Sequence, residues 1–317
     1  MQRCRTLVFL LVLAGTLIPS CTRAEPSTLE GRLRRIVSRL GGEIGERNTV
    51  RYSALLETES YLAEELRRAG YTVDRQEFQA EGKTVANLIA ELPGSTRAGE
   101  VLVLGAHYDS ARGTPGANDN ASGVAALLAL AADLRGAAPA RTVRFVFFVN
   151  EEPPYFYGPS MGSLVYARSL RAKNENVVGM ISLETMGWYT EQEGSQRIPP
   201  GLGGDLPTRG NFLALITREQ DSAFLAVVES AYRAATSFPV TSLAAPEEVQ
   251  GIGWSDHWAF WQAGYPGVMA TDTAPFRYDP YHSPKDTPDK LNYPRFAAAV
   301  QGTEEAVKTL AEAPSQK

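Results

Sequence analysis

Histidines accompanied by acidic residues are the first feature of this sequence that could do chemistry. The chain has only three histidines. His107, His257 and His282 each have an aspartate within four positions, and none falls on the apolar face of a helical pattern. An isolated histidine is more often a structural group. An acid at Asp109, however, could hold the second imidazole nitrogen of His107, the arrangement usual for metal-bound histidines.

Carboxylates placed just after apolar runs are the second feature. Glu151 and Glu152 follow the apolar run 143–149, Glu184 follows the apolar run 177–183, and Asp119 lies in a Gly- and Asn-rich loop before a helical pattern. A solvated strand end would explain the glutamates, and a helix N-cap would explain Asp119. Asn120 could serve as that cap instead. Unpaired carboxylates at buried strand ends are costly, and a divalent cation would offset the cost.

Together these side chains form a candidate metal-binding set without sulfur. Nitrogen and oxygen donors suit zinc, with cobalt or manganese as alternatives, better than calcium. The donors exceed the roughly three protein ligands of one catalytic zinc. They fit two ions about 3.5–4 Å apart that share a carboxylate and a water. Glu151 is then free to act as a general base. The candidate metal ligands are His107, Asp119, Glu152, Glu184 and His282.

A strand–helix–strand pattern over residues 101–152 must position most of these groups. Apolar runs at 101–104 and 143–149 flank a helical pattern at about 122–134, and the run 177–183 predicts a further strand. Ligands of open parallel sheets bind beyond the carboxyl ends of the strands, where these side chains fall. Strands separated by helices predict an α/β fold: a three-layer sandwich with a mixed, mostly parallel sheet and helices on both faces.

The other helical and strand patterns are expected to belong to the same catalytic domain, which is predicted to span residues 25–317. The segment from Gly187 to Gly210 lacks periodicity and predicts a long lid or binding loop. Helices are predicted at 29–40, 54–69, 162–172, 221–235 and 293–310, and strands at 71–78, 84–92 and 267–270, with a turn at 81–83.

Composition and the N-terminus restrict compartment and partners. The net charge is −5 with both signs interspersed, so a nucleic-acid partner is not expected. Basic residues precede an apolar run at 7–18, which indicates a signal peptide ending at residue 24. Alternatively, residues 17–21 resemble a lipoprotein box, so that a signal over residues 1–20 would leave Cys21 lipidated. Either case predicts an exported protein, periplasmic or in the cell envelope, or else secreted. A lipid on Cys21 would be the only membrane contact. The only cysteines are Cys4 and Cys21, so the mature domain has no thiol nucleophile.

Five motifs in order give the sequence a family resemblance. The segments GAHYDS, GANDNASG, NEE, LETMG and YHSPKDT resemble the co-catalytic di-zinc exopeptidases of metallopeptidase clan MH, the aminopeptidases and glutamate-carboxypeptidase-like enzymes. The resemblance covers about residues 84–310. It implies a mixed sheet between helices, two zinc ions per chain and a peptide substrate.

The resemblance also implies a role for each matched residue. One zinc is held by His107 and Glu184, and the other by Glu152 and His282, with Asp119 bridging the two. Glu151 is implied to be the catalytic base, and Asp109 to orient His107.

Departures from the family pattern concern specificity. Glu184 stands where many members carry aspartate, and the insertion 153–159 replaces a short Gly-rich turn after Glu152. The motif at 254–257 resembles one that lines the same site. Asp256 and His257 are therefore candidates for contacting substrate or supporting a ligand.

Other activities are open at this stage. A serine hydrolase could use Ser160 in its G-x-S-x-G segment, but that motif needs a strand leading directly into the serine. A carboxypeptidase-type or a glutaminyl-cyclase-like enzyme, or a metal-free receptor, would keep the fold. A cyclase normally lacks the first histidine ligand, and a receptor should have lost ligands.

Overall fold

The computed structural model describes residues 28–202 and 206–313 of the chain. The expected signal peptide, its cleavage site and Cys21 lie outside the described residues. Among the helices that are described, none has the length and apolar character needed to cross a membrane.

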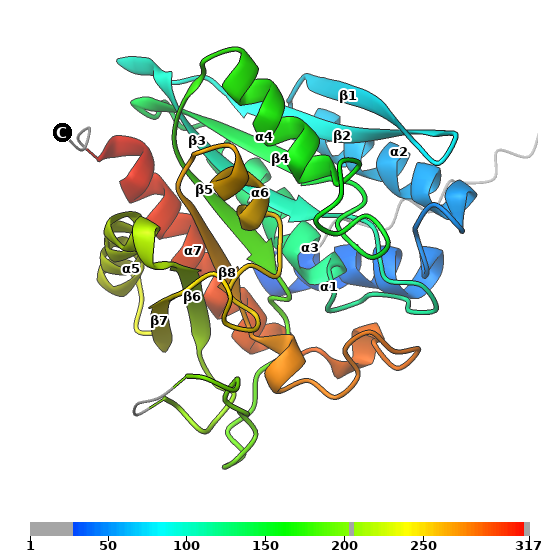
Figure 1. Ribbon diagram of the computed structural model, residues 1–317, viewed down its shortest axis with the longest axis vertical. Coiled ribbons are helices and arrows are strands. Elements are labelled where there is room, and N and C mark those ends of the chain that lie inside the picture. Colours follow the sequence, from blue (N-terminus) through cyan, green and yellow to red (C-terminus); the bar gives the residue numbers. More distant parts are fainter. Residues whose placement is uncertain (1–27, 203–205, 314–317) are drawn as a thin grey trace, which may run out of the picture.

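One eight-stranded mixed sheet runs through the molecule in the order β1-β2-β4-β3-β5-β8-β6-β7 (Figure 1). Neighbours β3–β4, β3–β5, β5–β8 and β6–β7 are parallel, and the remaining pairs are antiparallel. The strands are β1 (Val73–Ala80), β2 (Lys83–Leu92), β3 (Arg97–His107), β4 (Arg141–Phe148), β5 (Asn176–Glu184), β6 (Leu213–Arg218), β7 (Val240–Ala245) and β8 (Gly267–Thr271).

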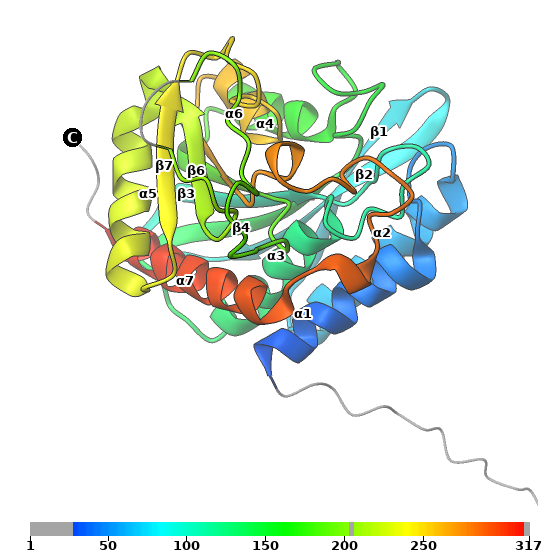
Figure 2. The same ribbon diagram turned by 90° about the horizontal axis from the view of Figure 1, so that it is seen from below.

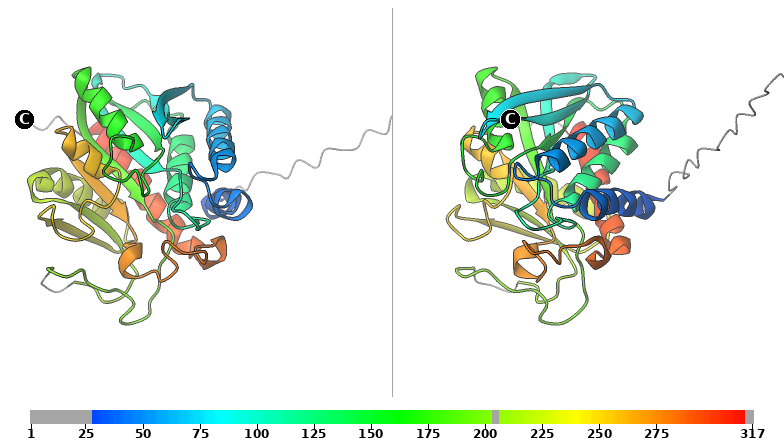
Figure 3. Two further views of the ribbon diagram at one scale, coloured as in Figure 1. Left: turned by 45° about the vertical axis from the view of Figure 1, so that its right-hand side comes forward. Right: turned by 90° about the vertical axis from the view of Figure 1, so that its right-hand side faces the viewer.

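Helices cover both faces of this sheet, which confirms the predicted α/β architecture. Helices α4 and α6 pack on one face, and α1, α2, α3, α5 and α7 lie on the other (Figure 2). Figure 3 shows the N-terminal helices, in blue, alongside α3. The helices are α1 (Leu29–Val37), α2 (Tyr52–Arg68), α3 (Ala121–Leu134), α4 (Gly162–Ala172), α5 (Ser222–Ala235), α6 (His257–Gln262) and α7 (Tyr293–Glu312), with a π-helix η1 (Ser38–Ile44) and short 3-10 turns η2 (Glu219–Asp221), η3 (Ala274–Phe276) and η4 (Pro288–Lys290).

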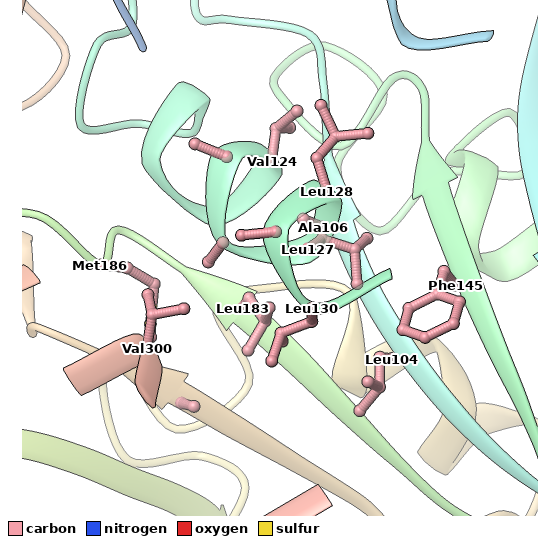
Figure 4. Packing of buried hydrophobic residues seen from close by; sticks show 14 of the residues in the cluster. Leu104, Ala106, Val124, Leu127, Leu128, Leu130, Phe145, Leu183, Met186 and Val300 are labelled. Atoms are coloured by element: carbon pink, nitrogen blue, oxygen red, sulfur yellow. The ribbon is translucent and has the colours of Figure 1, made fainter. Parts of the chain in front are cut away.

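Helix α3 is buried on nearly every side, and the loop before it carries Asp119. Leu127 and Leu130 are fully buried near Leu104 of β3 and Leu183 of β5 (Figure 4). Burying each such leucine contributes roughly 1.5–3 kcal/mol. The helix start and the strand ends that face it are thereby held at fixed positions.

Several elements differ from the sequence expectation. The first helix is α-helical only to Val37 and continues as a π-helix to Ile44, whereas one helix to Leu40 was expected. Strands β6 and β7 were not predicted, because each is only six residues long and lacks clear alternation between buried and exposed positions. Residues 187–210 contain no helix or strand among those that are described, as expected.

Candidate metal centre

Three adjacent strands bring the first side chains of the site together. His107 is the last residue of β3, Glu184 is the last residue of β5, and Glu151 and Glu152 follow the end of β4. Because β4, β3 and β5 are parallel neighbours, their carboxyl ends meet at one edge of the sheet. Asp119 comes from the loop before α3, and His282 from the segment before α7, drawn in orange in Figure 1.

The side chains form two groups with ligand atoms within 4.8 Å of one another, and Asp119 links them. The first group contains His107, Glu151 and Glu184, and the second contains Asp119, Glu152 and His282. Asp119 Oδ1 lies 3.3 Å from His107 Nε2, and Asp119 Oδ2 lies 2.9 Å from His282 Nε2. One carboxylate therefore faces both histidines, as a bridging ligand must.

Short distances also connect each histidine to a glutamate. His107 Nε2 lies 3.2 Å from Glu184 Oε2, and His282 Nε2 lies 3.2 Å from Glu152 Oε2. Glu151 Oε2 is farther from His107 Nε2, at 3.8 Å. Of the acids near His107, Glu151 is thus the one held less closely by the histidine.

Burial and missing hydrogen bonds indicate that these donors fit a cation. Asp119, Glu152 and Glu184 are almost completely buried. Asp119 Oδ1 and Glu152 Oε1 have no hydrogen-bond partner among the described residues. Buried polar atoms without partners are rare and costly, and a dication would satisfy them. Nitrogen and oxygen donors without sulfur match zinc.

The protonation behaviour of the acids follows from the same burial. Burial raises the pKa of Glu151 well above its ordinary value, and neighbouring Glu152 adds to the effect. Burial likewise raises the pKa of Glu184, and raises that of Glu152 to about 7. Burial acts the same way on Asp119, but the two histidines beside its oxygens outweigh it and lower the pKa of Asp119 below its usual range. Asp119 is therefore the most firmly ionised of these acids.

Asp109 lies beside His107 and also contacts the segment after β4. Its Oδ1 is 3.6 Å from His107 Nδ1, too long for a hydrogen bond. Its carboxylate instead accepts the backbone N–H groups of Glu151 at 3.1 Å and Glu152 at 3.2 Å. Asp109 thus fixes the segment that carries the two glutamates, and its contact with the imidazole is secondary.

Local backbone structure around the ligands is strained. Asn150, Thr185 and His282 have positive φ angles of 61°, 44° and 52°. Such angles are unfavourable for non-glycine residues and persist where the surroundings enforce them. The Thr185 N–H donates to Asn120 Oδ1 at 3.0 Å, and the same oxygen caps α3 by accepting from the Gly123 N–H. Asn120 therefore acts as the cap, which leaves Asp119 free to face the histidines.

Ser255, which lies in the motif at 254–257, contacts Glu184, although no role was predicted for this serine itself. Its hydroxyl donates to Glu184 Oε2 at 2.8 Å and also lies 2.8 Å from the hydroxyl of Ser182. Asp256 beside it is fully buried, and neither carboxylate oxygen has a hydrogen-bond partner in the described part of the chain. Burial raises the pKa of Asp256 to about 7, and the charge of His107 opposes the rise.

His257 is not brought into either ligand group. Its ring is fully buried, and Nε2 lies 2.7 Å from the carbonyl of Ile252. Burial lowers the pKa of His257 to about 4, so the ring is neutral. The ring thus supports the loop at Ile252, and it lies in neither of the two groups of histidines and acids that the described residues form.

An apolar pocket adjoins the centre on the side of Glu184 and Tyr281. Its walls come from β6, β7, β8, the loops at 250–254 and 275–276, and the long loop after β5, which contributes Gln196 to Pro199. Apolar lining residues include Ile216, Leu243, Ile252, Trp254, Met269 and Phe276. The pocket borders the ligand Glu184, so a side chain bound there would lie next to the candidate metals.

The insertion after Glu152 forms turns anchored by aromatic rings. Tyr157 stacks on Phe156 with ring centroids 4.0 Å apart and contacts Trp258 at 4.3 Å. Its hydroxyl donates to the Gly253 carbonyl at 3.2 Å. Ser160 follows in these turns, well beyond the end of β4, and its hydroxyl has no hydrogen bond to a histidine among the residues described. The nucleophile elbow that a serine hydrolase needs is therefore not formed.

Sequence reasoning missed two buried charged residues that hold the Asp119 loop. Asp286 accepts the N–H groups of Asn118 at 2.8 Å and Asp119 at 3.1 Å, and Arg47 binds carbonyls of the same loop. Asp286 lies in the YHSPKDT motif, so the motif itself was a usable signal. Arg47 lies far from any motif, and nothing in the sequence set it apart.

The fold and this arrangement of histidines and carboxylates are typical of metal-dependent hydrolases whose site lies at the carboxyl edge of a mixed sheet. Comparison with known proteins makes the assignment specific. Residues 87–307 match the model of peptidase family M28, and the chain belongs to this family. This confirms the resemblance to clan MH exopeptidases.

The chain is also similar to individual proteins in sequence or fold. The chain is 37% identical over 295 residues to the uncharacterized protein YfbL of Escherichia coli, covering 90% of this chain and 88% of that protein. Its fold is similar to a zinc aminopeptidase from Bacillus subtilis, with a TM-score of 0.73, 16% identity and coverage of 93% and 98%. It is also similar to a glutaminyl cyclase from Fimbriiglobus ruber, with a TM-score of 0.67, 20% identity and coverage of 88% and 94%.

Proposed function

We propose that this metallopeptidase is an aminopeptidase that uses two zinc ions and Glu151 to remove an apolar N-terminal residue from peptides. The observation that carries the proposal is the position of Asp119, whose two oxygens face His107 and His282 separately. Solved structures of similar fold include a zinc aminopeptidase.

The chain's own groups account for the steps of hydrolysis. Bound zinc supplies Lewis-acid chemistry, polarising a carbonyl and lowering the pKa of water. Glu151 is buried beside the ligands, and its raised pKa suits a group that accepts a proton from water and passes it to the departing amine. Asp109 keeps Glu151 in position through the backbone N–H.

Charge favours recognition of an amino terminus over a carboxyl terminus. A terminal carboxylate needs an available cation near the scissile bond. Arg47 is occupied by backbone carbonyls, and Arg197 at the pocket is bonded to Asp279 and Pro275. The buried carboxylates of the centre give it a negative charge, which suits an approaching substrate ammonium group better than a carboxylate.

The apolar pocket supports a preference for leucine-like or aromatic terminal residues. The test is the kcat/KM of purified protein on aminoacyl amides with leucine, phenylalanine, lysine and aspartate side chains. We expect leucine and phenylalanine substrates to be preferred. Leu243→Lys should lower their kcat/KM by about 10-fold or more, because burying an apolar side chain against a charge is unfavourable.

Two results would overturn this function. Hydrolysis that depends on a free carboxyl terminus would make the enzyme a carboxypeptidase. Cyclisation of N-terminal glutamine with one bound zinc would make it a glutaminyl cyclase.

We also propose export of the protein, on the basis of the sequence at residues 1–24. Basic residues followed by the apolar run 7–18 support a signal peptide. Incorporation of labelled fatty acid that is lost in Cys21→Ala would support the lipoprotein form. A mature N-terminus at residue 25 without lipid would support simple secretion.

A further inference from the structure

Arg47 is a buried cation whose guanidinium donates hydrogen bonds mainly to the backbone of the loop between His107 and Asp119. The side chain is 0% exposed. Among the described residues its guanidinium bonds only backbone carbonyls: Tyr108 at 2.7 Å, Pro115 at 2.6 Å, Gly116 at 2.8 Å and Gly45 at 3.2 Å. Burying a charge without a direct ion pair is costly. The hydrogen bonds that the guanidinium donates to several carbonyls at once must offset this cost, and a neutral side chain could not donate all of them.

The backbone of Arg47 is joined to the same loop. Its N–H donates to Ser110 Oγ at 3.1 Å, and its carbonyl accepts the Ser110 N–H at 3.0 Å. Ser110 Oγ in turn donates to the Thr114 carbonyl at 3.1 Å. The loop therefore cannot shift relative to the segment that follows η1 without breaking several buried hydrogen bonds.

Gly116 shows how closely the parts fit. A Cβ atom at this position would lie 2.4 Å from the Asp119 carbonyl oxygen and 3.2 Å from an Arg47 guanidinium nitrogen. Its φ of 62° is also in the left-handed region. The guanidinium thus packs directly against the turn that leads into Asp119.

Asp286 is a buried anion that contacts the other end of the same loop. It accepts the N–H groups of Asn118 and Asp119 and the hydroxyl of Tyr278 at 2.9 Å. One buried cation therefore binds the loop's carbonyls, and one buried anion binds its amides. The loop between them carries Asp119, the carboxylate that faces both histidines.

We propose that Arg47 is a positioning residue of the metal centre, which holds the loop so that the Asp119 carboxylate can serve both ion sites. The inference rests on the proposed two-zinc function. Arg47 lies outside residues 87–307, so the family match does not include it. The planar guanidinium serves several carbonyls at once, which a lysine ammonium on a flexible stem cannot reproduce.

Zinc affinity tests this role directly, because it does not depend on turnover. Metal-free wild type, Arg47→Lys and Arg47→Met are titrated with zinc against a competing chelator, and the melting temperature of each metal-free protein is recorded. Both variants should bind zinc about 10- to 100-fold more weakly, the range for losing a group that orients metal ligands.

Arg51→Met is the matched control. Arg51 lies in the same segment, is largely exposed and pairs with Glu46. Its replacement should leave zinc affinity within about twofold, since an exposed ion pair contributes little. Native zinc affinity in Arg47→Lys or Arg47→Met, even with a lowered melting temperature, would show that Arg47 serves folding alone and would overturn the proposal.

Ser110→Ala keeps the proposal testable should both Arg47 variants fail to fold. It removes the hydroxyl between the Arg47 N–H and the Thr114 carbonyl while leaving the guanidinium in place. We expect zinc binding to weaken by about 3- to 10-fold, the cost of a typical hydrogen bond; unchanged affinity would refute the proposal. Wild type that binds two zinc ions but releases no amino acids would refute the proposed function and leave this inference intact.

Discussion

Replacing Glu184 by aspartate tests whether side-chain reach matters at this centre. Glu184 ends β5, and its backbone is paired with Thr271 of β8. Glu184 Oε2 lies 3.2 Å from His107 Nε2 and accepts the Ser255 hydroxyl at 2.8 Å. Aspartate is shorter by one carbon–carbon bond, about 1.5 Å. Because the strand lies inside the sheet, the backbone cannot move forward to compensate.

The expected loss follows from the hydrogen bond that the shorter side chain gives up. A hydrogen bond to a charged group contributes about 1.5–3 kcal/mol. We therefore expect Glu184→Asp to bind zinc about 10- to 150-fold more weakly in the group containing His107. The group containing Glu152 and His282 should be affected less, since Glu184 has no contact with either.

Competition between metal-free protein and a zinc chelator measures this effect. Ser255→Ala is the control that removes the hydroxyl donor and keeps the reach of Glu184. It loses the hydrogen bond with Glu184 but keeps the position of the carboxylate relative to His107, so it should weaken zinc binding by no more than the lower end of that range. Wild-type affinity for both ions in Glu184→Asp would refute the argument that the longer side chain is required here.

Two further predictions concern Glu151 and His257. Glu151→Gln should lower kcat by about 10²- to 10⁴-fold, the range for losing a general base, while zinc content stays near the wild-type value; full activity would contradict the assigned role. The pKa of His257 is about 4 in the folded protein, against an ordinary value of about 6.5 in the unfolded chain. As the pH falls below about 6.5, the unfolded chain therefore binds a proton that the folded protein does not. Up to ~3 kcal/mol of stability is lost between about pH 6.5 and 4. Urea unfolding of metal-free protein at pH 7.5 and 4.5 should show a smaller loss in His257→Gln than in wild type, and an equal loss would show that the histidine is not held neutral.

Residues at the ends of apolar runs explain why much of the site was predictable. A side chain at the carboxyl end of a predicted strand can be placed in space, because the carboxyl ends of parallel neighbouring strands meet at one edge of the sheet. His107, Glu152 and Glu184 therefore had to lie near one another once β3, β4 and β5 were recognised. His282 required the motif, because no strand carries it.

The missed features depend on contacts between distant segments. Arg47 is recognisable only when η1 and the loop at 108–116 are placed together, which no local pattern encodes. A second contact of Asp109 was missed for a related reason. Its spacing from His107 predicted a position beside the imidazole, where its Oδ1 lies 3.6 Å from Nδ1. The same carboxylate also accepts two N–H groups of the turn after β4, which no local pattern predicts. Likewise, His257 matched a motif, yet its ring is buried against Ile252.

Metal content of the folded chain is the most direct test of the account. Purified protein, dialysed after exposure to zinc, should hold about two zinc ions per chain, with Asp119 as the shared ligand. Asp119→Ala should hold about one or none while remaining folded. A wild-type chain that binds no zinc, or an Asp119→Ala protein that still binds both ions tightly, would contradict the claim that Asp119 joins two metal sites.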